Sequence, residues 1–141
     1  MTQNAFAARV FFMNRHARLL GIEGGGTKTE WVLAAEGIVQ DHGAFGTGNL
    51  RLITDEILLS YFHRIPAEAD AVGIFLAGCV STADRQRVQQ LAQERWPTAF
   101  FLIGSDRESG FETILGEGSG ILAIAGTGSS IMGQHQGRTE F

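Results

Sequence analysis

The sequence predicts an α/β fold in which a mixed β-sheet carries helices on its faces. Three strand-like segments come first, at residues 19–23, 29–35 and 38–45, and short turns separate them. Helix-like and strand-like segments then alternate, which favours parallel strands joined by helical connections. A strand–turn–strand unit with a Gly-Thr turn opens the series and returns near residue 120. This repeated unit suggests two duplicated lobes, of which the sequence contains only the first part of the second.

The middle of the chain has the clearest patterns. Residues 51–64 place apolar side chains on one face of a predicted helix. Residues 71–77 are a nearly continuous apolar run, which predicts an interior, parallel strand that is buried on both faces. Ser81 is a suitable N-cap for a second helix that runs to about Trp96, where Pro97 ends it.

The last third of the chain has shorter elements. A strand at residues 99–103 and a helix at 108–115 precede a hairpin that is formed by residues 119–125 and 130–133. The first strand of that hairpin is apolar and has no predicted neighbour on its other side. Such an edge invites pairing with a second copy of the chain, as in a homodimer, or with another partner.

Two Gly-Thr loops carry the functional signal. They are Gly24-Gly25-Gly26-Thr27-Lys28-Thr29 and Gly126-Thr127-Gly128-Ser129, and each lies between two strand-like segments. Glycine lets the backbone approach phosphate oxygens, and successive N–H groups form an anion-binding nest. The spacing excludes a Walker loop and a dinucleotide-binding loop, because both lead into a helix and residues 31–35 resemble a strand. Each loop alone is as well explained by an ordinary turn, but the pair predicts a nucleotide held from both sides.

Composition narrows the class of protein. The chain has 141 residues, 44% of them hydrophobic, and a net charge of −4, which suffices for one ordinary domain with a buried core or slightly more. Its 11 Lys and Arg residues form no basic stripe for nucleic acid, and no apolar run reaches the ~20 residues of a membrane span. The single cysteine, Cys79, permits no intrachain disulfide and no multi-thiolate metal site, so we expect a reduced, cytoplasmic protein. We interpret residues 1–17 as a flexible tail or as the result of a start codon assigned too far upstream.

The run from Gly21 to Thr29 resembles the first phosphate motif of the actin, hexokinase and heat-shock ATPase superfamily. More narrowly, it is similar to that of the N-acetylglucosamine kinases and the BadF/BadG/BcrA/BcrD-type ATPases, and residues 125–129 resemble the second phosphate motif of this branch. The resemblance implies two RNase H-like lobes, as in the actin-like ATPase fold, with the active site between them. Residues 18–116 would form the N-terminal lobe, and residues 117–141 the opening β-hairpin of a truncated second lobe.

The resemblance also implies an ATP site with Mg²⁺. Glu23 stands where many relatives have Asp, and would position Mg²⁺ through water; the alternative is an ordinary hairpin carboxylate. Lys28 would neutralise phosphate or lie in solvent. The implied nucleotide-binding residues are Gly24, Gly25, Gly26, Thr27, Lys28, Gly126, Thr127, Gly128 and Ser129.

The acceptor side of the implied reaction depends on two further residues. Asp106 matches the aspartate that takes the proton from the acceptor hydroxyl in the sugar kinases, and its alternative role is a helix N-cap. Asn49 matches an asparagine that binds sugar hydroxyls, and its alternative role is a cap for a helix that starts near Leu50. Ser129 and Ser130 complete the implied substrate-binding set.

Three functions follow from these residues. The first is an ATP-dependent sugar kinase that acts on N-acetylglucosamine or glucosamine, with weak or no activity in a truncated chain. The second is an activator-type ATPase, but the iron–sulfur cysteines of that group are absent, as are the zinc-binding cysteines of the repressor/kinase group. The third is a non-catalytic fragment that serves as an interaction module. The interlobe segment and the adenosine-binding motif of the family are also absent.

Overall fold

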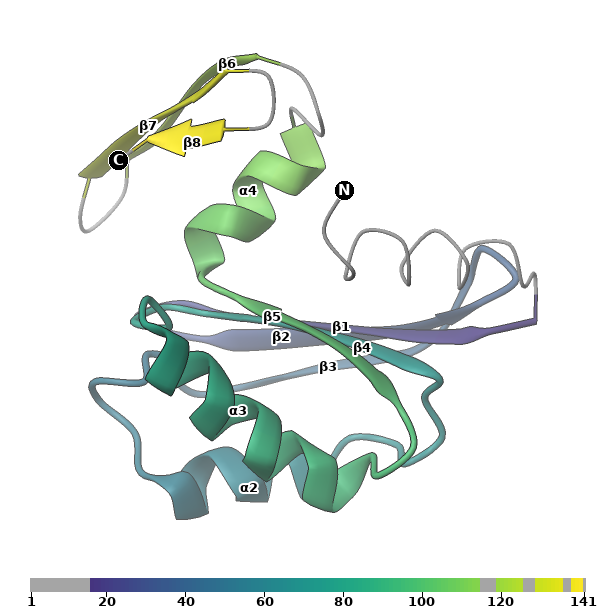
Figure 1. Cartoon of the computed structure of the whole chain (residues 1–141). Coiled ribbons are helices and arrows are strands. Elements are labelled where there is room, and N and C mark those ends of the chain that lie inside the picture. The colour runs from purple at the N-terminus through teal and green to yellow at the C-terminus, as the bar shows by residue number, and fades with distance from the viewer. Residues whose placement is uncertain (1–15, 115–118, 126–128, 136–137, 141) are drawn as a thin grey trace. The chain divides into compact units, whose positions relative to one another are not determined.

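The computed structural model describes residues 16–114, 119–125, 129–135 and 138–140 (Figure 1). The chain divides into two compact units, Met1–Asp106 and Arg107–Phe141. Each unit has its own β-sheet.

The first unit contains a five-stranded mixed sheet, as predicted. Its strands are β1 (Arg18–Gly24), β2 (Thr29–Ala35), β3 (Ile38–Phe45), β4 (Ala71–Leu76) and β5 (Phe100–Gly104), in the order β3-β2-β1-β4-β5. β1 is antiparallel to β2 and parallel to β4, and β4 is parallel to β5. The interior, parallel position expected for residues 71–77 is therefore confirmed. Side chains of β4 alternate between buried and half-buried, so one face of the strand is more deeply covered than the other.

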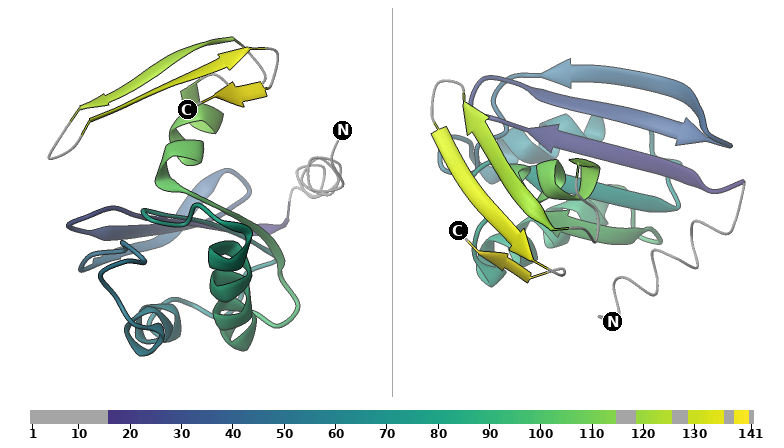
Figure 2. Two further views of the ribbon diagram at one scale, coloured as in Figure 1. Left: turned by 60° about the vertical axis from the view of Figure 1, so that its left-hand side comes forward. Right: turned by 90° about the horizontal axis from the view of Figure 1, so that it is seen from above.

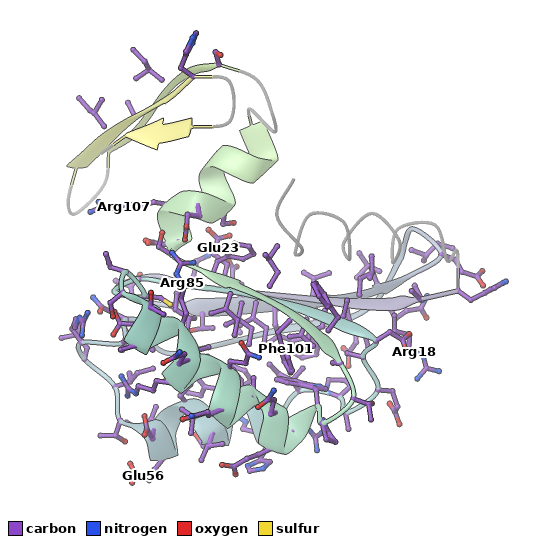
Figure 3. All side chains as sticks on the ribbon, viewed as in Figure 1. Arg18, Glu23, Glu56, Arg85, Phe101 and Arg107 are labelled. Carbon is purple, nitrogen blue, oxygen red and sulfur yellow. The ribbon has the colours of Figure 1, made fainter. Side chains whose placement is uncertain are left out.

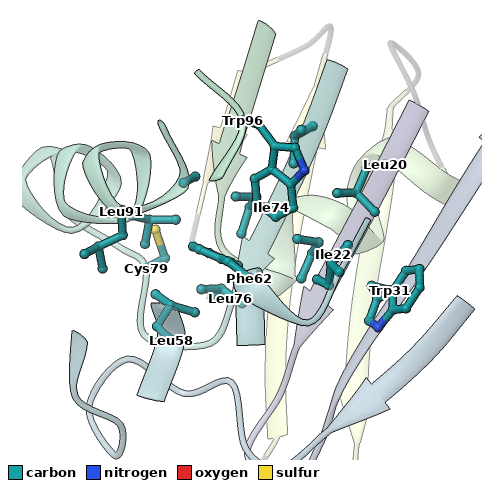
Figure 4. Packing of buried hydrophobic residues seen from close by; sticks show 14 of the residues in the cluster. Leu20, Ile22, Trp31, Leu58, Phe62, Ile74, Leu76, Cys79, Leu91 and Trp96 are labelled. Carbon is teal, nitrogen blue, oxygen red and sulfur yellow. The ribbon is translucent and has the colours of Figure 1, made fainter. Parts of the chain in front are cut away.

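Two helices, α2 (Asp55–His63) and α3 (Thr82–Arg95), cover the same face of this sheet, as Figures 1 and 2 both show. The core lies between them and the sheet (Figure 4). Phe62 of α2 meets the ring of Trp96 edge-on, with the ring centroids 5.3 Å apart, and both side chains are almost fully buried. The indole Nε1 of Trp96 donates to the carbonyl of Pro66 at 2.9 Å, so its one polar atom is satisfied. The rest of the central core comes from Leu20, Ile22, Leu58, Val72, Ile74, Leu76, Val88 and Ala92.

The two helices differ in how well the sequence predicts where they start. Ser81 is the N-cap of α3, as expected, and it forms a capping box with Asp84. The prediction that the earlier helix starts near residue 51 is wrong. α2 begins at Asp55, and the hydroxyl of Thr54 accepts a hydrogen bond from the N–H of Ile57 at 3.4 Å.

The second unit consists of α4 (Asp106–Ile114), β6 (Gly120–Ala125), β7 (Ser129–His135) and β8 (Arg138–Glu140), with Asp106 at the junction of the units. The predicted hairpin corresponds to β6 and β7, and β8 is an additional strand that extends the sheet to the order β6-β7-β8. α4 starts two residues before the predicted helix at 108. None of the helices in the part of the chain that the structure describes has the length and apolar character that a bilayer crossing needs.

The carboxylate of Asp84 has an unusually low pKa. The N–H and the hydroxyl of Ser81, the N–H of Val80 and the guanidinium of Arg51 all stabilise the charged form, against the opposing effect of burial, and they lower the pKa from 3.8 to about 2. The charged carboxylate is therefore part of the folded structure near neutral pH.

We expect replacement of Phe62 by Ala to reduce the free energy of unfolding by about 3–5 kcal/mol, because a fully buried ring leaves a cavity. Leu52→Ala is the control, since Leu52 is 66% exposed, and its effect should stay within about 0.5 kcal/mol. Urea unfolding of both variants measures the difference. Equal effects of the two substitutions would contradict the position of Phe62 in the core.

We expect the stabilising effect of Asp84 to depend on pH. Because folding lowers this pKa, the contribution is fully present above pH about 4 and is lost as the pH falls towards 2. The difference in unfolding free energy between the parent chain and Asp84→Asn should accordingly shrink over that interval. Urea titrations at several pH values test this, and a difference that does not vary between pH 5 and pH 2 would count against it.

Candidate functional site

The carboxyl ends of three parallel strands meet at one edge of the first sheet. Gly24, which ends β1, is the register partner of Leu76, which ends β4, and Phe75 pairs with Gly104 at the end of β5. β2 begins and β3 ends at the same edge, because Thr29 pairs with both Gly24 and Phe45. The connections at residues 25–28, 46–54, 77–81 and 105 therefore leave the sheet at one side. Ligand sites of open α/β sheets gather at such an edge.

Two glycines at this edge pack backbone against backbone. A Cβ on Gly24 would lie 2.8 Å from Cα of Gly48, and a Cβ on Gly48 would lie 2.5 Å from Cα of Gly24 and from Oγ1 of Thr29. Neither position has a positive φ, so close approach rather than backbone conformation requires glycine here. The N–H of Gly48 and the hydroxyl of Thr47 both donate to the carbonyl of Gly25, at 3.0 and 3.2 Å. The phosphate loop predicted at Gly24–Lys28 is thus attached to the connection that carries Asn49.

Further main-chain hydrogen bonds continue this network to the end of β4. Ala77 donates to the carbonyl of Gly24 at 2.7 Å and accepts from the N–H of Leu50 at 2.9 Å. Gly78 has φ 78°, and a Cβ there would lie 2.9 Å from Oδ1 of Asn49. The ends of β1 and β4 and the connection after β3 therefore form one hydrogen-bonded edge.

Asn49 is half-buried on this edge, and its alternative role as a cap of a helix near Leu50 is wrong. Its Oδ1 accepts from the N–H of Arg51 at 2.9 Å, which closes a side-chain-to-backbone turn before α2 begins. Its own N–H donates to the hydroxyl of Thr47 at 3.2 Å. The predicted role of Asn49 as a sugar ligand stays a prediction.

The first Gly-Thr loop is a tight, solvent-exposed turn between β1 and β2. Gly25 donates to the carbonyl of Lys28 at 2.8 Å, and Gly26, Thr27 and Lys28 are exposed. The ammonium of Lys28 lies 2.9 Å from the carboxylate of Glu30, so in this structure it forms an exposed ion pair.

The anion nest expected in this loop is not preformed. A nest needs neighbouring residues of opposite backbone handedness, and among the described residues positive φ occurs only at Glu36, Gly37 and Gly78. Within that part of the chain, the N–H groups of Gly26 and Thr27 donate no hydrogen bond. They are accordingly available to an anion from the solvent side.

Two acidic residues belong to the same edge. Glu23 is exposed on β1 (Figure 3), and its register partner on β2 is Glu30. Asp106 is half-buried and begins α4, after the buried Ser105. Across the described ranges, no three acidic, His or Cys side chains come close enough to hold a metal ion by themselves. Mg²⁺ keeps several waters and needs few carboxylates, so Glu23 beside Glu30 fits a water-mediated site.

Arg85 is a residue at this edge that sequence reasoning missed. It lies on α3, is half-buried, and donates from Nη1 to the carbonyl of Ile103 at 2.7 Å (Figure 3). It therefore brings a guanidinium to the end of β5, three residues before Asp106. The sequence predicts that Arg85 lies near the start of a helix, but it does not predict that its side chain contacts β5.

The second Gly-Thr loop belongs to the second unit. Gly126, Thr127 and Gly128 lie outside the described residues. Ser129 and Ser130 begin β7, where their backbones pair with Ala125 and Ile124. A nucleotide site built from both loops stays a prediction.

Comparison with known proteins identifies the fold. No protein-family profile and no curated protein sequence matches the chain. A candidate N-acetylglucosamine kinase from Porphyromonas gingivalis matches with a TM-score of 0.74 and 22% identity, over 86% of this chain and 46% of that one. The ethanolamine utilization protein EutJ from Carboxydothermus hydrogenoformans matches with a TM-score of 0.59 and 13% identity, over 86% and 49% of the two chains. ROK hexokinase from Thermus thermophilus matches with a TM-score of 0.56 and 19% identity, over 86% and 47%.

These matches establish the architecture. The chain has the fold of a lobe of the actin-like ATPases, with the mixed sheet described above. It spans about half the length of the solved chains that it matches. Its relation to sugar kinases is a distant structural similarity.

We expect Gly24→Ala to destabilise the chain by about 1–3 kcal/mol, because the added methyl group meets Leu76 and the backbone of Gly48. Gly26→Ala is the matched control in the same loop. Nothing lies within 4 Å of a Cβ at Gly26, and its unfolding free energy should change by less than about 1 kcal/mol. Urea unfolding measures both, and a Gly24 variant as stable as the Gly26 variant would show that the two backbones are not in contact.

Proposed function

We propose that this chain, which has the fold of an actin-like ATPase lobe, provides the acceptor side and both phosphate loops of an ATP-dependent sugar kinase. The reaction would transfer the γ-phosphoryl group of ATP to a hydroxyl of an amino sugar, N-acetylglucosamine or glucosamine. One observation supports this most strongly. The exposed Gly-Thr turn after β1, Asn49 after β3 and Asp106 after β5 all follow strands that end at the same edge of one sheet.

Each of these residues has a chemical task in the proposed reaction. Asp106 accepts the proton of the attacking sugar hydroxyl, so that the oxygen becomes a better nucleophile. The N–H groups of Gly26 and Thr27 and the hydroxyl of Thr27 bind phosphate oxygens. Phosphoryl transfer asks mainly for such positioning and charge stabilisation.

Mg²⁺ would be held near Glu23 through water, and it would neutralise charge on the phosphates. Lys28 contributes a further positive charge if its ammonium leaves the ion pair with Glu30 and binds phosphate instead. The resemblance assigns Thr127, Gly128 and Ser129 to the opposite side of the nucleotide, and Ser130 to the sugar. Two of the structural matches, the candidate N-acetylglucosamine kinase and the ROK hexokinase, are named as sugar kinases, which supports this choice of reaction.

A cytoplasmic location accords with this function, because ATP is abundant there and the single Cys79 is buried. One observation favours a second candidate, an interaction module. Ile121 and Ile131 are 76% and 73% exposed on the second sheet, where β6 is an edge strand. An open edge strand beside exposed isoleucines suits pairing with a second copy of the chain.

The proposal is tested by calorimetric titration of ATP-Mg²⁺ and of N-acetylglucosamine or glucosamine into the purified chain, and by measuring the phosphorylated sugar, whose rate of formation should be low in this chain. We expect Asp106→Asn to lower the rate by about 10²–10⁴-fold, as loss of a general base does, while calorimetric titration shows nucleotide binding unchanged. Asp41→Asn, an exposed carboxylate on β3, is the control and should leave the rate unchanged.

Calorimetry also tests the second loop, since Thr127→Ala should weaken ATP-Mg²⁺ binding. A folded chain that binds neither nucleotide nor sugar would refute the kinase proposal. Concentration-dependent dimers in sedimentation would then favour the interaction module.

A further inference from the structure

We propose that Arg51 and Asp84 position Asn49, so that Asn49 presents the N–H donors of its amide to a ligand. This inference rests on the proposed function, because it takes Asn49 as a sugar-binding residue. It adds a positioning pair that lies outside the predicted site, and it restricts the kind of group that Asn49 can bind.

The orientation of the Asn49 amide follows from its partner. Oδ1 faces the N–H of Arg51 at 2.9 Å, and an N–H group can only donate. The usual ambiguity between the oxygen and nitrogen of an asparagine amide is thereby resolved. Gly78 confirms the tight fit on this side, because a Cβ there would lie 2.9 Å from the same oxygen.

The amide nitrogen of Asn49 faces the opposite way. Among the described residues it donates no hydrogen bond, and the only buried polar side-chain atom without a partner there is Nε1 of Trp31. Nδ2 of Asn49 is therefore reached by solvent. It offers two N–H donors at the edge where the predicted site residues gather.

The turn that holds Asn49 is attached to α3 by an ion pair. Nη2 of Arg51 lies 3.0 Å from Oδ2 of Asp84, whose side chain is only 9% exposed. The same oxygen accepts from the N–H of Val80 at 3.2 Å, and from the N–H and hydroxyl of Ser81 at 2.9 and 2.8 Å. The hydrogen bonds at the N-cap of α3 thus hold the carboxylate of Asp84 in place, and the ion pair in turn restricts the position of Arg51.

The backbone around Asn49 is held as well. Its carbonyl accepts from the N–H groups of Leu52 and Ile53, at 2.9 and 3.2 Å. The side chain therefore sits on a turn that is closed by its own atoms, while Arg51 and Asp84 hold the turn against the helix. Loss of the ion pair would leave the turn intact but loosely placed.

A donor at this position selects for acceptor groups. A sugar hydroxyl accepts from Nδ2 and still has its own proton to give to a base such as Asp106. A carbonyl oxygen of an acetamido group also accepts, whereas a protonated amine cannot. The arrangement thus favours a hydroxyl or an acetamido group next to Asn49 and disfavours an ammonium group.

Asn49→Asp tests the donor directly. Aspartate keeps an oxygen for the N–H of Arg51 and forms the same turn, but it has no N–H to donate. We expect the affinity for N-acetylglucosamine, measured by calorimetric titration into the full chain, to fall about tenfold or more. Unchanged affinity in a variant that is as stable as the parent would overturn the donor assignment.

Asp84→Asn tests the positioning pair without any ligand. Nuclear magnetic resonance relaxation of the Asn49 side-chain ¹⁵N–¹H₂ group should show greater motion in this variant than in the parent chain. The matched control is Asp55→Asn, which removes the 2.6 Å ion pair between Asp55 and Arg87 at the other end of the same connection. Equal order of the Asn49 amide in all three chains would overturn the positioning role.

The two measurements separate this inference from the proposed function. If the parent chain binds neither N-acetylglucosamine nor glucosamine, the kinase proposal fails and the donor assignment fails with it. The relaxation measurement still decides whether Arg51 and Asp84 position Asn49. If the parent chain binds sugar and Asn49→Asp binds it with the same affinity, the kinase proposal stands and the donor assignment is wrong.

Discussion

The close approach of Gly24 and Gly48 is the constraint on which the candidate site depends. Two backbones that meet without side chains between them bring the Gly-Thr turn after β1 against the connection after β3. The carbonyls of Gly24 and Gly25 then accept hydrogen bonds from Ala77, Thr47 and Gly48. Any side chain at this contact would push the loops apart. The shape of the candidate site thus depends first on the lack of a Cβ atom at Gly24 and at Gly48, and only then on its polar groups.

The arginines of helix α3 attach it to the main chain around it. Arg87 and Arg95 donate to carbonyls in the connections before and after α2, and Arg85 donates to the carbonyl of Ile103 in β5, in addition to the apolar contacts of the buried face of the helix. Guanidinium groups suit this task because each has five donors in a fixed plane. The helix therefore links the two connections around α2 to the end of β5. The acceptors are the carbonyl oxygens of Leu50, Ile53, Ile65 and Ile103.

The sequence predicts the sheet better than it predicts the site. Alternation and turn residues placed β2 and β3 at their observed bounds, and the apolar run at 71–77 indicated an interior strand, because burial of strands leaves a local pattern. The helix start was predicted too early because an asparagine uses the same side-chain oxygen in a turn and in a helix cap. In the structure Asn49 forms the turn, and Thr54 is the cap of α2. The reach of Arg85 to Ile103 depends on tertiary packing between helix and strand, which leaves no local signal.

The central position of β1 has a consequence for the order of folding. β1 pairs with its neighbour β2 across a short turn, but with β4 only after the intervening helix and connections have been made, as in the register of Leu19 with Ala71. Closing the longer loop costs more chain entropy, so we expect parallel pairing to follow the local meander. During synthesis the first three strands emerge before β4, and the Gly-Thr turn already lies between β1 and β2. The part of the edge at β5, which Asp106 follows, should then form last, when β5 pairs with β4.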